Sequence, residues 1–273
     1  MTIEAAAPRT PSSNERPATP ARSTSPGRRV LLGAHYSPWT ERARWALDHH
    51  GIHYRFEEHV PVLGEPALRL RLGRAHRGHA TVPVLFDGDR VVPDSLEIVL
   101  HADRIGGGAP LVVDPDATRR FFARVDRGLV ALRGRVLASI LDDPEAQRDS
   151  VVGVPKAWAA WMRPAVRAST RYMARKYGVT GPSRAEFEPE IRAMLLELRE
   201  AVDGGSLAID RFGAEHLAAA TFLQGVRPVR TEHIPLSDAL RRAWTCESLA
   251  EEFADVLAWR DRLYRERRFP SGS

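Results

Sequence analysis

Residues 30–47, VLLGAHYSPWTERARWAL, carry the strongest structural signal in this 273-residue chain. The run Val30-Leu31-Leu32 is apolar and has the length of a buried strand. Ser37 is a favoured residue for a helix N-cap, and Pro38 suits the first helical turn. Apolar residues then recur on one helical face until a glycine ends the pattern. The stretch predicts a buried strand joined by a short turn to an amphipathic helix over residues 38–50.

The residues that follow continue this alternation of strands and helices. We expect strands at 53–58, 82–86 and 90–92, and helices at 65–72 and from 93 onward. Asp87-Gly88 is the turn signal of a β-hairpin between the last two strands. The order β-α-β-α-β-β-α predicts a small open sheet covered by helices.

Composition shifts divide the chain into four parts. Residues 1–28 are rich in Pro, Ser, Thr, Ala and Arg and poor in large apolar side chains, so we expect a disordered tail. The sheet domain is predicted at 29–103, and a linker at 104–113 contains a Gly triplet. The rest, 114–269, has helical patterning throughout. Its predicted helices span 116–141, 155–177, 184–202, 214–226, 236–245 and 246–267.

Composition and charge exclude several classes of function. Cys246 is the only cysteine, which rules out an intrachain disulfide and a thiolate metal cluster. The formal charge of +5 falls to +2 once residues 1–29, with five Arg and two Glu, are set aside. The Arg-rich end 260–268 is interpreted as a solvated helix face. No apolar run is long enough for a membrane span. We therefore expect a cytoplasmic protein without nucleic-acid, membrane or metal binding.

Five short motifs occur in an order that resembles the cytosolic glutathione transferase family. They are YSPWTERARWAL at 36–47, TVPVL at 81–85, DS at 94–95, FGAEHL at 212–217 and LAWRDR at 257–262. The resemblance implies a thioredoxin-like N-terminal domain followed by an all-helical C-terminal domain. It also implies glutathione as co-substrate, a homodimer and a role in detoxification. Within the family, the chain resembles a serine-type, bacterial-like member.

Ser37 is the candidate catalytic residue. A thiol attacks as its thiolate, and a hydroxyl at the positive end of a helix can stabilise that anion by a hydrogen bond. By resemblance, Ser37 occupies the position of the family's catalytic Ser or Cys. The alternative is that Ser37 only caps its own helix. Tyr36 is a rival donor, and its alternative is an ordinary buried residue at the end of the strand.

The resemblance also implies the residues that bind glutathione. Val82-Pro83 resembles the family's cis-proline, which leaves the backbone of the preceding residue free to pair with the peptide. Asp94 and Ser95 lie where the family binds the γ-glutamyl group, although Asp94 could equally form a capping box with Glu97. Thr81 replaces the family's usual Lys before Val-Pro, and His79 is one candidate to supply the missing contact.

Ser at position 37 favours one reaction type over another. A hydroxyl cannot form a mixed disulfide, so conjugation of glutathione to a hydrophobic electrophile is expected rather than disulfide reduction. Trp158 is either a wall of the electrophile pocket or a core residue. A non-catalytic binding protein, use of another small thiol and a glutathione-dependent isomerase remain alternatives. Gly213 and His216 replace a capping box of the family, and we expect its reciprocal side-chain bonds to be lost.

Overall fold

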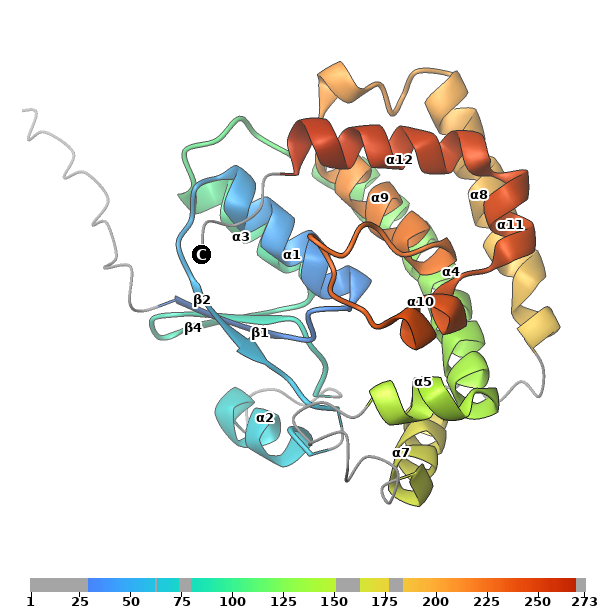
Figure 1. Cartoon of the computed structure of the whole chain (residues 1–273). Coiled ribbons are helices and arrows are strands. Elements are labelled where there is room, and N and C mark those ends of the chain that lie inside the picture. Colours follow the sequence, from blue (N-terminus) through green and yellow to red (C-terminus); the bar gives the residue numbers. More distant parts are fainter. Residues whose placement is uncertain (1–28, 62, 74–79, 151–162, 177–183, 269–273) are drawn as a thin grey trace, which may run out of the picture.

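The computed structural model of the chain describes residues 29–61, 63–73, 80–150, 163–176 and 184–268. Its N-terminal part is a four-stranded sheet of order β2-β1-β3-β4, in which β1 and β2 are parallel and the other pairs antiparallel. Helices α1 and α3 pack together beside the sheet, and α2 lies apart from them (Figure 1). The elements are β1 (Arg29–Gly33), α1 (Pro38–His49), β2 (Arg55–Glu58), α2 (Glu65–Leu72), β3 (Val84–Asp87), β4 (Arg90–Pro93) and α3 (Ser95–Ile105).

The alternation of side chains along the strands builds a core on each face of the sheet. Leu31 and Leu85 join the large cluster that includes α1, α3 and much of the helical part. Their neighbours Leu32 and Val84 point the other way, into a small cluster with Leu68 of α2. One hydrophobic face therefore joins the sheet to the helical part of the chain, and the other packs against α2.

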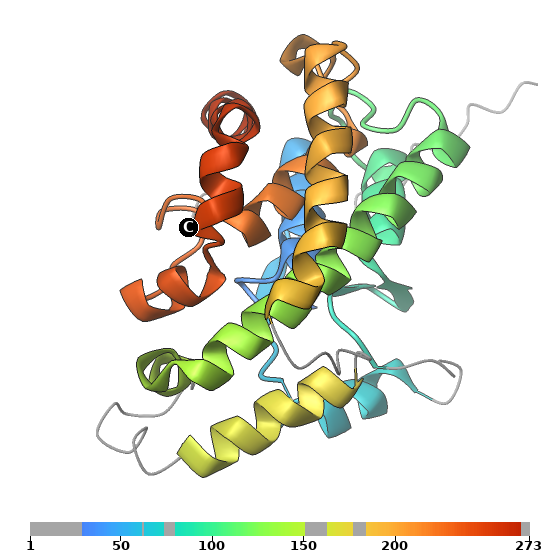
Figure 2. The ribbon, with the colours of Figure 1, turned by 90° about the vertical axis from the view of Figure 1, so that its right-hand side faces the viewer.

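The remainder of the described chain is helical. The long helix α4 crosses the bundle next to α9 and α8, while α7 extends away from them to lie beside α2 (Figure 1, Figure 2). The helices are α4 (Pro115–Asp142), α5 (Pro144–Asp149), α7 (Arg163–Lys176), α8 (Glu188–Asp203), α9 (Ala214–Val226), α10 (Asp238–Trp244), α11 (Glu247–Glu252) and α12 (Ala254–Arg267), with 3-10 turns at Arg184–Phe187 and Ile209–Arg211. None of the helices in these described ranges is long and apolar enough to cross a membrane. The predicted fold, a thioredoxin-like domain followed by a mostly helical region, is confirmed.

Three predictions about the elements were wrong in detail. The third strand begins at Val84, not at 82. Helix α5 was not predicted, although Asp143 caps it by accepting from the backbone N–H groups of Glu145 and Ala146. The predicted helix 246–267 is broken into α11 and α12 at Phe253, whose backbone leaves the helical region (φ −112°, ψ 33°) while its ring is fully buried.

The interpretation of 260–268 as a solvated helix face was also wrong for its two end residues. Arg260 is 1% exposed and donates to the carbonyl oxygens of Leu223 and Arg227, at the end of α9. Arg268 is 5% exposed and binds the carboxylate of Glu41, in the first turn of α1. These guanidinium groups satisfy buried oxygen atoms, so their charge is not available to an external partner.

The prediction that residues 213 and 216 lose their reciprocal cap was partly wrong. Gly213 has no side chain to offer, but its backbone N–H donates to Nδ1 of His216 at 3.2 Å. The other ring nitrogen of His216 lies 3.0 Å from the carbonyl oxygen of Ala208. Burial lowers the pKa of His216, which favours the neutral ring that this arrangement needs. One half of the capping box is thus kept, with an imidazole as the acceptor.

Candidate functional site

The turn that carries Ser37 is held by its own backbone. The N–H of Ser37 donates to the carbonyl oxygen of Ala34 at 2.9 Å, and the carbonyl of Ser37 accepts from Glu41 at 2.9 Å. Ser37 is the N-cap residue of α1, with extended backbone angles, yet its side chain makes no capping hydrogen bond. The half-buried hydroxyl of Ser37 therefore lies at the positive end of α1 without the local role that Ser usually has there.

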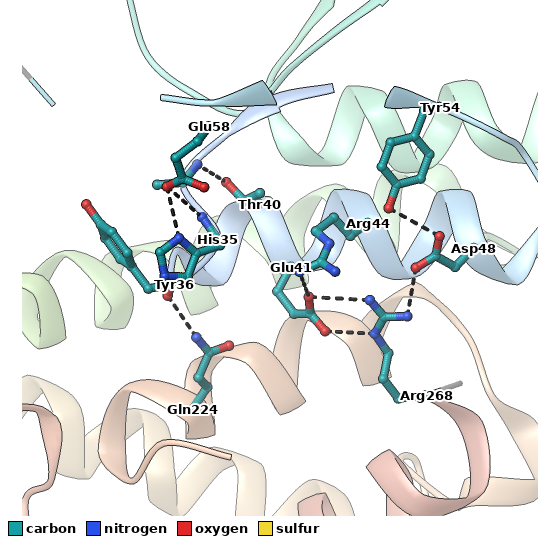
Figure 3. A network of polar contacts seen from close by, with 11 residues as sticks. His35, Tyr36, Thr40, Glu41, Arg44, Asp48, Tyr54, Glu58, Gln224 and Arg268 are labelled. Atoms are coloured by element: carbon teal, nitrogen blue, oxygen red, sulfur yellow. Dashed lines mark hydrogen bonds and ion pairs between the residues drawn. The ribbon is translucent and has the colours of Figure 1, made fainter. Parts of the chain in front are cut away.

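Residues from three other elements contact this turn, and Figure 3 shows two of them, Glu58 and Gln224. On the sheet side, His35 contacts the carboxylate of Glu58 at the end of β2, with Nδ1 3.0 Å from Oε1. On the helical side, Gln224 of α9 donates to the carbonyl oxygen of Tyr36 at 2.9 Å. The ring of Tyr36 meets Trp244 of α10 edge-on, with centroids 6.0 Å apart. Tyr36 is thus engaged with the helical part through both its backbone and its ring.

The sheet brings the other predicted binding residues to the same edge. Strand β1 pairs with β3 so that Leu32 faces Val84, and β3 pairs with β4 so that Val84 faces Pro93. Continuing these antiparallel registers past the strand ends places the Val82-Pro83 bond beside the turn before Ser37 and beside Asp94. The Val82-Pro83 bond is cis, as the resemblance implies.

Asp94 has an unusual backbone and a perturbed carboxyl group. Its φ of 72° is in the left-handed region, and its carboxylate accepts from the N–H of Leu96 at 2.8 Å, as an N-cap does. The residue is exposed, but surrounding protein desolvates the carboxyl group and, with the nearby charge of Asp126, raises its pKa. Next to it, Ser95 is 1% exposed and its hydroxyl has no hydrogen-bond partner among the described residues.

Sequence reasoning missed the charged pair that joins α1 to α4 and whose charges act on Asp94. The guanidinium of Arg42, fully buried, donates to Asp126 of α4 at 2.6 Å and to the hydroxyl of Thr221 at 3.0 Å. Trp39, in the first turn of α1, donates to the same carboxylate at 3.1 Å. The positive charge of Arg42 acts to lower the pKa of Asp94 and so opposes the charge of Asp126, although the net shift of that pKa is upward. No sequence signal marks Asp126, because it is one acidic residue among several on a long helix.

A second missed contact joins the helical part to the segment before the cis bond. Lys176, at the end of α7, donates to the carboxylate of Glu65 at 2.5 Å and to the carbonyl oxygen of Ala80 at 3.1 Å. Tyr172 of α7 donates to the other oxygen of Glu65 at 3.1 Å. The exposed Thr81 follows Ala80 directly, so α7 holds a lysine ammonium on the backbone one residue before position 81.

Two of the predicted residues, His79 and Trp158, lie outside the described residues. Over the ranges that the structure does describe, no three His, Cys, Asp or Glu side chains come close enough together to hold a metal ion. The predicted residues that the structure does bring to one edge of the sheet are Ser37, Val82, Pro83, Asp94 and Ser95, with Tyr36 and Thr81 beside them.

Comparison with known proteins gives a family match for the N-terminal part of the chain. Residues 31–110 match the family described as glutathione S-transferase, N-terminal domain. The chain is similar to glutathione S-transferase U13 of Arabidopsis thaliana, with 33% identity over 94 residues, or 34% of this chain and 40% of that protein. A probable glutathione S-transferase of Solanum tuberosum is 31% identical over 94 residues, 34% of this chain and 41% of its own. The match thus spans less than half the length of these curated relatives.

Solved structures extend the likeness of fold over most of the chain. Glutathione transferase GSTFuA3 from Phanerochaete chrysosporium has a TM-score of 0.54 at 16% identity, covering 89% of this chain and 98% of its own. A glutathione S-transferase from Methylobacterium radiotolerans, solved in complex with glutathione sulfonate, has a TM-score of 0.51 at 19% identity, covering 87% of this chain and 91% of its own. The architecture is that of the glutathione S-transferases. The family model matches residues 31–110, so the likeness of sequence that it shows concerns the sheet domain.

Proposed function

We propose that this protein is a glutathione transferase that joins the glutathione sulfur to a hydrophobic electrophile, with the thiolate formed at Ser37. The single observation that carries the proposal is the Ser37 hydroxyl, which lies at the N-terminus of α1 and makes no capping hydrogen bond. A hydroxyl in that position can donate to a sulfur anion, and the helix dipole favours the same charge. The thiol proton leaves to solvent, and the thiolate then forms a carbon–sulfur bond as the leaving group departs with its electron pair.

The binding assignments follow the same edge of the sheet. The backbone of Val82, before the cis Pro83, would pair with the cysteinyl part of the peptide. Asp94 would accept from the γ-glutamyl ammonium, and the Ser95 hydroxyl with the N-terminus of α3 would meet its carboxylate. Tyr36 is the weaker candidate for the thiolate donor, because its ring and carbonyl are engaged with Trp244 and Gln224.

The test compares two serines that both precede a helix. Ser37→Ala should leave stability nearly unchanged, since no capping bond is lost, but should raise the pKa of bound glutathione. Losing one hydrogen bond to a charged group lowers conjugation at neutral pH by about ten- to a hundredfold. Ser237→Ala is the matched control, because Ser237 does cap α10 by accepting from Leu240 at 3.3 Å. That variant should lose about 1 kcal/mol of stability and keep its activity.

The alternatives give different results in the same assays. Retention on immobilised glutathione without turnover would favour a non-catalytic binding protein, a reading that Thr81 in place of the family's lysine supports. No retention would favour another small thiol. Wild-type conjugation by Ser37→Ala would mean that the hydroxyl has no part in thiolate formation, and Tyr36 would become the candidate donor.

We also propose that the protein works as a homodimer, as the family resemblance implies. The body of the chain carries only a small net charge, so repulsion would not oppose association of two copies. A strictly monomeric mass in solution at micromolar concentration would contradict this part of the proposal.

A further inference from the structure

Helix α9 is buried from His216 to its last residue, so each polar side chain there must find a hydrogen-bond partner. The residues from Leu217 to Val226 are all fully buried, and only Thr221 and Gln224 among them have polar side chains. Burying a polar group costs free energy unless it finds a hydrogen-bond partner. Thr221 accepts from Arg42 of α1, and Gln224 donates to Tyr36. Both contacts cross from the helical part to the segment that contains Ser37.

The contact of Gln224 acts on the peptide group that immediately precedes Ser37. The carbonyl of Tyr36 and the N–H of Ser37 belong to one planar unit. Gln224 holds the oxygen of that unit at 2.9 Å, and Ala34 holds its N–H at 2.9 Å. The C=O and N–H bonds of a trans peptide group point in opposite directions, so hydrogen bonds to both ends fix the orientation of the peptide plane. The next peptide is fixed by the bond from Glu41 to the carbonyl of Ser37.

We propose that Gln224 is a positioning residue that sets the direction of the Ser37 Cα–Cβ bond, from which the hydroxyl reaches the sulfur. With both flanking peptides fixed, the Cα–Cβ bond of Ser37 has one direction, and the hydroxyl, which makes no capping bond, is left with the few staggered rotamers about that bond. The residue that orients the thiolate donor therefore belongs to the helical part of the chain. This inference rests on the proposed function, in which Ser37 stabilises the glutathione thiolate.

A shape-conserving substitution separates the hydrogen bond from the packing. Gln224→Met keeps most of the buried volume and removes the donor, and Gln224→Asn keeps an amide that is one methylene too short to reach Tyr36. The matched control is Gln147→Met on α5. Gln147 is also buried and also donates to a backbone carbonyl, that of Leu141 at 2.7 Å. As with Gln224, its side-chain oxygen has no hydrogen-bond partner within the described ranges.

Two readouts are measured on each full-length variant. The first is hydrogen exchange of the Ser37 amide, which requires no glutathione and should become about two- to tenfold faster in both Gln224 variants, the span of one neutral hydrogen bond. The second is the pH titration of bound glutathione. The thiolate fraction at neutral pH should fall by the same factor, with the glutathione dissociation constant changed by less than about twofold. Gln147→Met should match the wild type in both.

The outcomes distinguish this inference from the proposed function. If the wild type ionises glutathione and the Gln224 variants ionise it equally well, the positioning role is overturned and the proposed function stands. If the wild type neither binds nor ionises glutathione, the proposed function is overturned. In that case hydrogen exchange alone tests whether Gln224 orders the turn at Ser37. Unchanged protection of the Ser37 amide in the Gln224 variants would overturn the inference as well.

Discussion

Replacement of Arg268 by methionine should destabilise the protein far more than replacement of another arginine on the same helix end. The Nε of Arg268 donates to Glu41 at 2.8 Å and its Nη1 to Asp48 at 2.7 Å (Figure 3). The side chain of Glu41 is 1% exposed and that of Arg268 is 4% exposed, so Arg268→Met leaves a buried carboxylate without its main partner. Breaking a buried pair from one side costs about 3–5 kcal/mol.

The matched control is Arg262→Met, because Arg262 also lies on α12. Its partner Glu266 is 3.9 Å away, and both side chains are more than half exposed. An exposed pair is worth about 0–1 kcal/mol. For a chain of this size, the Arg268 variant should melt roughly 6–20 °C lower than the wild type, while the Arg262 variant should stay within about 4 °C.

Urea unfolding and thermal melts of both variants make the comparison. A double variant, Glu41→Met with Arg268→Met, should recover part of the loss, because apolar side chains then replace both charges. Equal effects of Arg268→Met and Arg262→Met would refute the argument that burial decides the cost.

Three further predictions concern a buried acid, the linker and the site. The pKa of Glu65 is lowered, because burial, which works to raise it, is outweighed by the hydrogen bond and charge of Lys176. That stabilisation is complete above the ordinary pKa of 4.5 and is lost as the pH falls through the lowered pKa. In urea unfolding, Glu65→Gln should therefore cost ~1.5–3 kcal/mol at neutral pH, and this cost should shrink below pH 4.5. Gly106→Ala should cost about 1–3 kcal/mol, because the added Cβ would lie 2.9 Å from a carbonyl oxygen, whereas Gly107→Ala, with nothing within 4 Å, should stay within about 0.5 kcal/mol in the same unfolding assay. Asp94→Asn should weaken glutathione binding about tenfold or more in calorimetry, and only the wild-type affinity should fall as the pH drops through the raised pKa of Asp94.

Local patterns were sufficient to predict the sheet domain. The apolar run at the first strand and the Ser-Pro start of the first helix agree with β1 and α1, because both signals depend on residues close in sequence. The same kind of signal, Asp143 before Pro144, was present for α5 and could have been used. The break at Phe253 had no such marker, since no Gly or Pro stands there, and the chain turns to bury an aromatic ring.

The candidate site was predictable in its residues but not in what surrounds them. Ser37 and Asp94 lie in motifs that the sequence displays directly. Gln224 lies 188 positions after Tyr36, and Lys176 lies 96 after Ala80, so no pattern along the chain relates the members of either pair. The lack of a capping hydrogen bond from the Ser37 hydroxyl likewise cannot be predicted from the sequence, because Ser before Pro is typical of an ordinary N-cap.

The contact between Glu41 and Arg268 also constrains how the chain is made. The two residues are 227 positions apart, so the first helix is synthesised long before the cation that neutralises its buried carboxylate. At about 5–20 residues per second, a ribosome takes roughly 10–45 s to cover that distance. During this interval the nascent sheet domain presents Glu41 and one side of α1 to solvent or to chaperones. Its final packing is therefore a late event, even though its sequence emerges first.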